Sequence, residues 1–216
     1  MALDKNLFQV FIDKVKFKFI PVYRLKDNSI YGYKIIKIFD EAGYKNRNEV
    51  YEMALDQNIF KFFFLKIQEK AYETAFKLGY SNAKFFHTLR INYIKDDYYF
   101  SSIIESLTSR FKLKKENIIF ELKGADNWKD LDRFLDVVDE EEYPILFKET
   151  AESPLNFNML CYLEPSFIEV ISFDTIKKLK QTKGIKSKII FKIPKDKDYT
   201  NKELLELGID LAYKVQ

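Results

Sequence analysis

The sequence is poor in the residues that most often carry enzyme chemistry. Among 216 residues there is one histidine and one cysteine, which excludes a disulfide framework and zinc sites built from several Cys or His side chains. Six glycines and five prolines are too few for a flexible linker. Lysines interrupt the most apolar stretch, residues 59–66, well short of the roughly 20 residues that a membrane-spanning helix needs, so we expect a buried helix there.

The charge composition argues against nucleic acid as a partner. Basic and acidic side chains number 36 and 33, and the net charge of +3 is too small and too evenly spread to indicate a polyanion. Only five of the basic residues are arginine, the side chain preferred for bidentate phosphate and base contacts. Residues 1–5 include an acid and show no secretory signal, so we expect a cytoplasmic protein without membrane contact.

The pattern of apolar residues predicts a barrel of strands and helices. A hydrophobic content of 47% is enough for one core, and we expect a single domain, 1–216. Short apolar runs alternate with stretches of helical period, and eight such runs predict a TIM-like (β/α)8 barrel. The expected strands are 16–23, 30–38, 84–89, 117–122, 144–148, 167–171, 188–193 and 209–213. The expected helices are 3–15, 47–80, 98–111, 128–139, 155–163, 173–181 and 201–207.

Three local features refine this prediction. Ser153 before Pro154 is typical of a helix entry, and Thr200 with Glu203 has the spacing of a capping box. Cys161 stands in an apolar run, so we expect it to be a small buried side chain.

Several of the expected strands carry one charged residue among apolar neighbours. These residues are Glu121, Lys148, Glu169 and Lys192, and Lys34 occupies a similar place in the second strand. A charge inside a buried parallel strand is costly unless it is paired. The C-terminal ends of barrel strands converge on one face, so we expect these side chains to form a charged cluster at the barrel mouth.

Seven segments, in order, give the chain a resemblance to a known family. Residues 21–25 resemble QPIVDL, and residues 30–36 stand where that family has its GxE-[AL]-L run. Residues 119–124, 144–149 and 163–170 resemble LEITE, the strand ending in DDFG, and LPPDYIKID. Residues 189–192 and 205–210 resemble VIAE and the ELGCD segment. The chain thus resembles the EAL domains, phosphodiesterases that hydrolyse cyclic dimeric GMP (cyclic di-GMP) with divalent metals.

The resemblance assigns residues of this chain to the family's active-site positions, namely Lys34, His87, Glu121, Lys148, Glu149, Glu169 and Lys192. Three of them place an ammonium group where the family has a carboxylate, and Glu169 stands where the family has its catalytic lysine. Divalent cations need several oxygen ligands. We therefore expect a degenerate EAL domain, of the EAL-only or EAL-HDOD type, with no metal, no cofactor and no catalytic residue, His87 included.

The main functional hypothesis is a catalytically inactive EAL-like module that regulates signalling through protein contacts, either with an unidentified protein or with a second copy. The chain ends a few residues after the last expected strand, so the helix that would cover this strand is missing and the barrel would be incomplete there. Three alternatives stay open: the helix at 3–15 covers the strand, a second subunit covers it, or the chain is part of a longer protein. Uncovered apolar barrel surface would suit such a partner.

Two alternatives remain open. The first is a non-hydrolysing sensor of cyclic di-GMP or another anion, although Ile20 and Ile38 replace polar ligand contacts of the family, so we do not expect cyclic di-GMP to bind. The second is an enzyme with unrelated chemistry that uses Lys148 or Lys192 with a depressed pKa.

Overall fold

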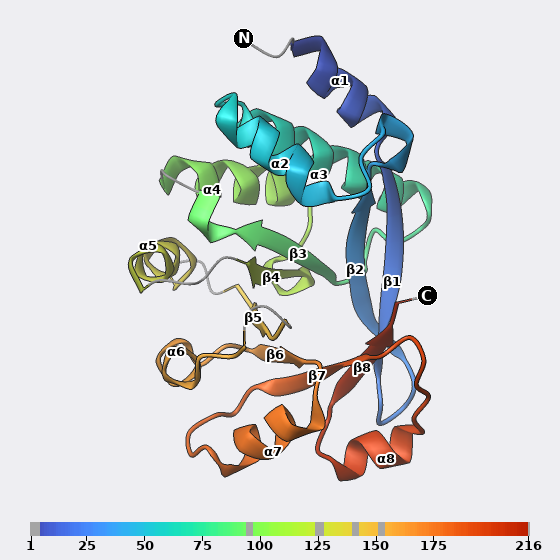
Figure 1. Ribbon diagram of the computed structural model, residues 1–216, viewed down its shortest axis with the longest axis vertical. Helices are drawn as coiled ribbons and strands as arrows, with labels where there is room; N and C mark the ends of the chain where they lie inside the picture. Colours follow the sequence, from blue (N-terminus) through green and yellow to red (C-terminus); the bar gives the residue numbers. More distant parts are fainter. Residues whose placement is uncertain (1–4, 94–96, 124–127, 140–142, 151–153, 216) are drawn as a thin grey trace. The chain divides into compact units, whose positions relative to one another are not determined.

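The computed structural model describes residues 5–93, 97–123, 128–139, 143–150 and 154–215 (Figure 1). The chain divides into two compact units. The first comprises Met1–Phe19, Ile35–Asn82 and Tyr93–Lys114, and the second comprises Ile20–Lys34, Ala83–Asn92 and Lys115–Gln216. The single domain expected from the sequence stays a prediction.

Eight strands form a closed barrel in the order β1 to β8, which confirms the TIM-like barrel. From β2 to β8 each strand runs parallel to the next, whereas β1 runs antiparallel to β8, with Tyr23 opposite Ala212. Hydrophobic periodicity reports which face of a strand is buried and not its direction, so the sequence could not distinguish this reversal. The bounds are β1 Lys16–Arg24, β2 Ile30–Ile38, β3 Phe85–Arg90, β4 Ile118–Lys123, β5 Ile145–Lys148, β6 Phe167–Val170, β7 Lys188–Ile193 and β8 Leu211–Lys214.

The helices follow the predicted segments with one break. The segment 47–80 forms two helices, because Asn58 adopts a left-handed conformation at φ 56°, which asparagine tolerates better than most residues. No helix within the described ranges is long and apolar enough to cross a membrane. The α-helices are α1 Lys5–Lys14, α2 Arg47–Asp56, α3 Phe60–Lys77, α4 Asp97–Glu105, α5 Trp128–Asp139, α6 Phe157–Leu163, α7 Phe173–Gln181 and α8 Asn201–Glu206. Shorter helical turns are η1 Asp40–Ala42, η2 Ile91–Tyr93, the π-helical η3 Ser106–Arg110 and η4 Lys115–Asn117.

Aromatic side chains form the core of the first unit. Phe63 of α3 packs edge-on against Phe8 of α1, with ring centroids 5.3 Å apart, and stacks on Phe39 at 6.3 Å. Helices α2 and α3 lie side by side in Figure 1. The apolar stretch 59–66 is thus a core helix, as predicted, although Phe62 on its outer side is 56% exposed.

Strand residues of the second unit alternate between the barrel interior and its outer layer. Phe191 of β7 faces outward, where it stacks on Phe173 of α7 at 5.0 Å and contacts Tyr199 at 5.9 Å. Phe120 of β4 likewise faces outward and contacts Phe134 of α5. Successive side chains of a strand point to opposite faces. The neighbours of these phenylalanines therefore point into the barrel.

The helix entries of the second unit are capped by short polar side chains. Thr200 and Glu203 form the predicted capping box at the start of α8. Ser153 lies outside the described residues, and α6 is capped instead by Asn156, whose side chain accepts hydrogen bonds from the N–H groups of Asn158 and Met159.

The expectation that Cys161 is buried is wrong. Cys161 is exposed on α6, whose buried residues are Met159 and Leu160. A helix turns about 100° per residue, so one position beyond Leu160 is enough to carry the thiol out of the core. An apolar neighbourhood in sequence does not fix which side of a short helix is covered.

Candidate functional site

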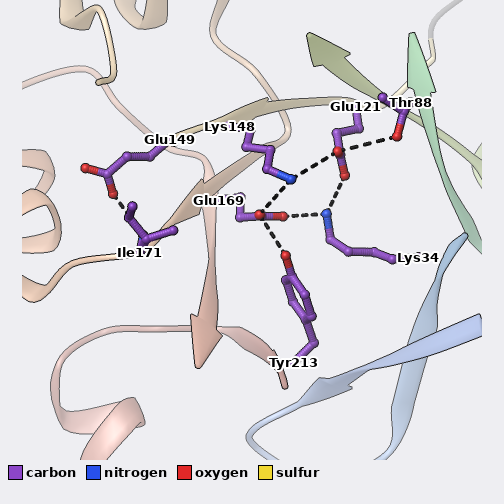
Figure 2. Close-up of polar contacts among 8 residues, drawn as sticks. All are labelled: Lys34, Thr88, Glu121, Lys148, Glu149, Glu169, Ile171 and Tyr213. Atoms are coloured by element: carbon purple, nitrogen blue, oxygen red, sulfur yellow. Dashed lines mark hydrogen bonds and ion pairs between the residues drawn. The ribbon is translucent and has the colours of Figure 1, made fainter. Parts of the chain in front are cut away.

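Four charged side chains of the second unit meet in a closed ring (Figure 2). The ammonium of Lys34 on β2 contacts the carboxylates of both Glu121 on β4 and Glu169 on β6. The Nζ of Lys148 on β5 lies 3.3 Å from Oε1 of Glu121 and 3.3 Å from Oε1 of Glu169. We call these four residues the ionic cluster. Its formal charge is zero, since two ammonium groups balance two carboxylates.

Strand register brings the ionic cluster together. Lys148 and Glu169 are Cα partners on β5 and β6, and Glu121 pairs with Leu146, two residues before Lys148. Paired residues of neighbouring strands, and residues two apart in one strand, share a face. These side chains therefore converge on the barrel interior, as the sequence predicts for Lys34, Glu121, Lys148 and Glu169.

Two uncharged side chains that the sequence did not indicate also contact the ionic cluster. The hydroxyl of Tyr213 on β8 donates to Oε1 of Glu169 at 2.8 Å, and the hydroxyl of Thr88 on β3 lies 3.5 Å from Oε1 of Glu121. The Nζ of Lys34 also lies 5.0 Å from the centroid of the Tyr213 ring. In the sequence, the one sign of a role for Thr88 and Tyr213 is that each is a polar residue towards the end of an apolar strand.

Burial and pairing set the protonation of the ionic cluster. Glu169 is 0% exposed, whereas the Lys148 side chain is 25% exposed and forms its more open edge. Burial alone would raise the pKa of Glu121, but the ammonium groups of Lys148 and Lys34 outweigh it and hold that pKa well below the ordinary value. The Glu121 carboxylate raises the pKa of Lys148 above its ordinary value, against the opposing effect of burial. The alternative of a Lys148 nucleophile with a depressed pKa is therefore wrong.

Glu149 does not join the ionic cluster. Its Oε2 accepts a hydrogen bond from the backbone N–H of Ile171 at 2.8 Å (Figure 2). Its Oε1 accepts one from the hydroxyl of Thr175 at 2.5 Å. It follows Lys148 directly in the chain, so it points to the opposite side. Glu149 thus ties the end of β5 to the first turn of α7.

His87 also lies away from the ionic cluster. Its Cα partner is the outward-facing Phe120, and the two rings contact each other at 5.8 Å. The next residue, Thr88, is the one that faces inward. The structure therefore brings the hydroxyl of Thr88, and not the His87 ring, to this part of the barrel.

The prediction that Lys192 joins the charged cluster is wrong: it faces the barrel interior but makes no ion pair with the ionic cluster. Its Cα partner is Tyr213, which reaches Glu169, and its neighbour Phe191 faces outward. Within the described part of the chain, Lys192 makes no hydrogen bond or ion pair. It is half-buried.

The residues of this site do not fit a divalent metal ion. Glu121 and Glu169 each contact both lysine ammonium groups, so a cation bound between them would lie beside two positive charges. Across the ranges that the structure describes, no three His, Cys, Asp or Glu side chains converge in a way that could hold a metal. A hard divalent cation needs about six oxygen ligands.

Comparisons with known proteins identify the type of fold. No protein-family model matches the sequence, and no curated protein does. Among solved structures, the chain is similar to the Xanthomonas citri FimX EAL domain in complex with c-diGMP, with a TM-score of 0.70, 12% identity, and coverage of 97% of this chain and 89% of that one. It is similar to an EAL domain protein from Listeria monocytogenes, with a TM-score of 0.68, 12% identity, and coverage of 99% and 92%.

A third similar structure is the Bacillus subtilis YkuI protein, with an EAL domain, in complex with c-di-GMP and calcium. The TM-score is 0.75 at 12% identity, over 98% of this chain and 57% of that one. This chain therefore has the EAL-type barrel fold.

These complexes correct the expected partner. We expected a protein partner and, from Ile20 and Ile38, no binding of cyclic di-GMP, yet structures of the same fold, the FimX EAL domain and YkuI, were solved in complex with that dinucleotide. The expectation that cyclic di-GMP does not bind rested on these two apolar substitutions.

Proposed function

We propose that this chain is a cyclic di-GMP signalling module that binds the dinucleotide, or an anion like it, without hydrolysing it. Its EAL-type fold is shared with domains solved with cyclic di-GMP. The proposal includes the cytoplasmic location expected from the sequence.

The observation that carries this proposal is a cation, Lys192, that faces the barrel interior near the C-terminal ends of the strands and makes no ion pair with a described residue. The ionic cluster is neutral, but Lys192 adds a positive charge on the inner face of β7. An inner face with this charge favours a ligand that carries phosphate.

The absence of hydrolysis in the proposal follows from the state of the carboxylates. The lowered pKa of Glu121 makes its carboxylate a weak base, and a general base works best with a pKa near the operating pH. Glu169 is fully buried and is bonded to two lysines and a tyrosine. Neither carboxylate is free to activate a water molecule or to coordinate a metal.

The test combines binding and turnover on the purified chain. Cyclic di-GMP is titrated calorimetrically, with GMP as a control for the base and a single phosphate. The same chain is incubated with cyclic di-GMP and Mg²⁺ or Mn²⁺, and the linear dinucleotide is measured by chromatography. We expect saturable binding near micromolar concentration and no linear product above the protein-free control.

Two results would contradict the proposal in different ways. Metal-dependent formation of the linear dinucleotide would show an active phosphodiesterase. A lack of heat change with cyclic di-GMP up to about 1 mM, which corresponds to a binding free energy weaker than about −4 kcal/mol, would exclude the sensor.

A further inference from the structure

Lys192 differs from the other inward-facing lysines in what surrounds it. Lys34 and Lys148 each contact two carboxylates, so their charges are already balanced inside the protein. Lys192 has no hydrogen-bond or ion-pair partner among the described residues. The residue is half-buried, so its positive charge lies in or beside the barrel interior without a carboxylate to balance it.

The register places Lys192 next to the ionic cluster and further along the strands. Glu169 pairs with Ile190, two residues before Lys192 on the same inward face of β7. Two strand residues span about 6.6 Å, so Lys192 lies one layer closer to the C-terminal end than Glu169. Its Cα partner Tyr213 donates to Glu169, which connects the two layers. The more exposed edge of the ionic cluster is Lys148, two strands away on β5.

We infer that Lys192 binds a phosphodiester group directly. This inference rests on the proposed function and identifies the atom that recognises the ligand. A phosphodiester carries a single negative charge, which one uncompensated ammonium balances. The two carboxylates of the ionic cluster are already paired with Lys34 and Lys148, so they do not compete with an anion for the ammonium of Lys192. Because the ionic cluster has no net charge, it does not repel the anion either.

The chain offers a matched control for this inference. Lys188 lies on the same strand and shares the inward face of Lys192, but it occupies the opposite, N-terminal end of β7 and is exposed. Lys192→Gln and Lys188→Gln remove the same charge from the same strand. Lys192→Arg keeps the charge and tests whether a cation is sufficient.

The experiment measures cyclic di-GMP affinity by calorimetry for the wild type and these three variants at about 50 mM and 200 mM salt. A charge-assisted contact is worth about 10- to 100-fold in affinity, so we expect Lys192→Gln to lose that factor. We expect Lys188→Gln to bind like the wild type and Lys192→Arg to recover most of the affinity. The affinity of Lys192→Gln should also depend less on salt, since one screened charge pair is gone.

The outcomes separate this inference from the proposed function. If the wild type binds and Lys192→Gln binds equally well, Lys192 is not the phosphate contact and the proposed function stands. If both glutamine variants lose the same affinity, the effect is one of net charge and the inference is overturned. If the wild type does not bind cyclic di-GMP, both are overturned. Equal melting temperatures of the variants would show that the loss of affinity does not arise from unfolding.

Discussion

Replacing Lys34 by methionine removes one ammonium from the ionic cluster, while the unbranched methionine side chain fills most of the same volume. Lys34 is 4% exposed and contacts both buried carboxylates. In the variant, Glu121 and Glu169 share only Lys148, so the ionic cluster changes from neutral to a net charge of −1. Removing one partner of a buried ion pair costs about 3–5 kcal/mol, because the stranded charge loses its compensation.

That loss is a large part of the stability of an ordinary domain, which is about 5–15 kcal/mol. The assay is urea unfolding followed by circular dichroism, with an unchanged slope showing that the unfolded state is comparable. The matched control is Lys177→Met on α7. Its ion pair with Asp174, at 3.4 Å, has side chains that are 69% and 85% exposed, so its loss should cost less than about 1 kcal/mol.

A compensating variant distinguishes charge imbalance from lost packing. Lys34→Met combined with Glu121→Gln leaves Lys148 opposite Glu169 and restores neutrality. We expect the double variant to recover about 1–3 kcal/mol relative to Lys34→Met, as contacting residues are energetically coupled. If Lys34→Met costs no more than Lys177→Met, or if the double variant loses the sum of both single effects, the reasoning from charge balance is refuted.

The pH dependence of the free energy of unfolding provides an independent test of this reasoning. The pKa of Glu121 in the folded chain lies below its ordinary 4.5, so its contribution to stability is present above that value and is lost as the pH falls through the folded pKa. The pKa of Lys148 lies above its ordinary 10.5, so its contribution is present below that value and is lost as the pH rises through the folded pKa. The cost of Lys34→Met should therefore be largest between about pH 5 and 10 and should shrink in acid, where the stranded carboxylate is protonated.

Three further variants test single contacts by urea unfolding. Tyr213→Phe removes the hydroxyl that donates to buried Glu169, and we expect a loss of about 1.5–3 kcal/mol; a loss no larger than that of an exposed Tyr→Phe variant would contradict the bond. Gly32→Ala would bring a Cβ to 2.7 Å from the backbone oxygen of Lys84, so we expect a loss of about 1–3 kcal/mol in the free energy of unfolding. Unchanged stability would mean that β2 and the residue before β3 can move apart there without cost. Thr200→Ala removes the capping box of α8 and should cost about 1 kcal/mol, whereas Thr200→Ser should retain most of that stability.

Much of the barrel could be predicted from the sequence because its strands are short apolar runs and its helices are amphipathic. Helices α5 and α7 begin and end at the predicted residues, 128–139 and 173–181. Two features could not be predicted. The antiparallel direction of β1 leaves no trace in periodicity, and the break at Asn58 depends on one residue adopting a left-handed conformation inside a continuous helical pattern.

The part of the site that consists of buried charges could be predicted from the sequence, because an unpaired buried charge is energetically costly. The meeting of Lys34, Glu121, Lys148 and Glu169 follows from this cost, whereas Lys192 does not join them. Sequence reasoning failed where a shift of one residue decides the face. Glu149 follows Lys148 directly, so only one of the two can point into the barrel.

The inward-facing charges near the C-terminal ends of the strands divide into two groups with different physical roles. The ionic cluster cancels its own charge, so its field falls off quickly with distance and it contributes mainly to the stability and shape of the barrel interior. Lys192 makes no ion pair among the described residues, so in the proposed complex the attraction of an anion depends on it. The free energy of unfolding therefore tests the role of the ionic cluster, and the affinity for a phosphodiester tests the role proposed for Lys192.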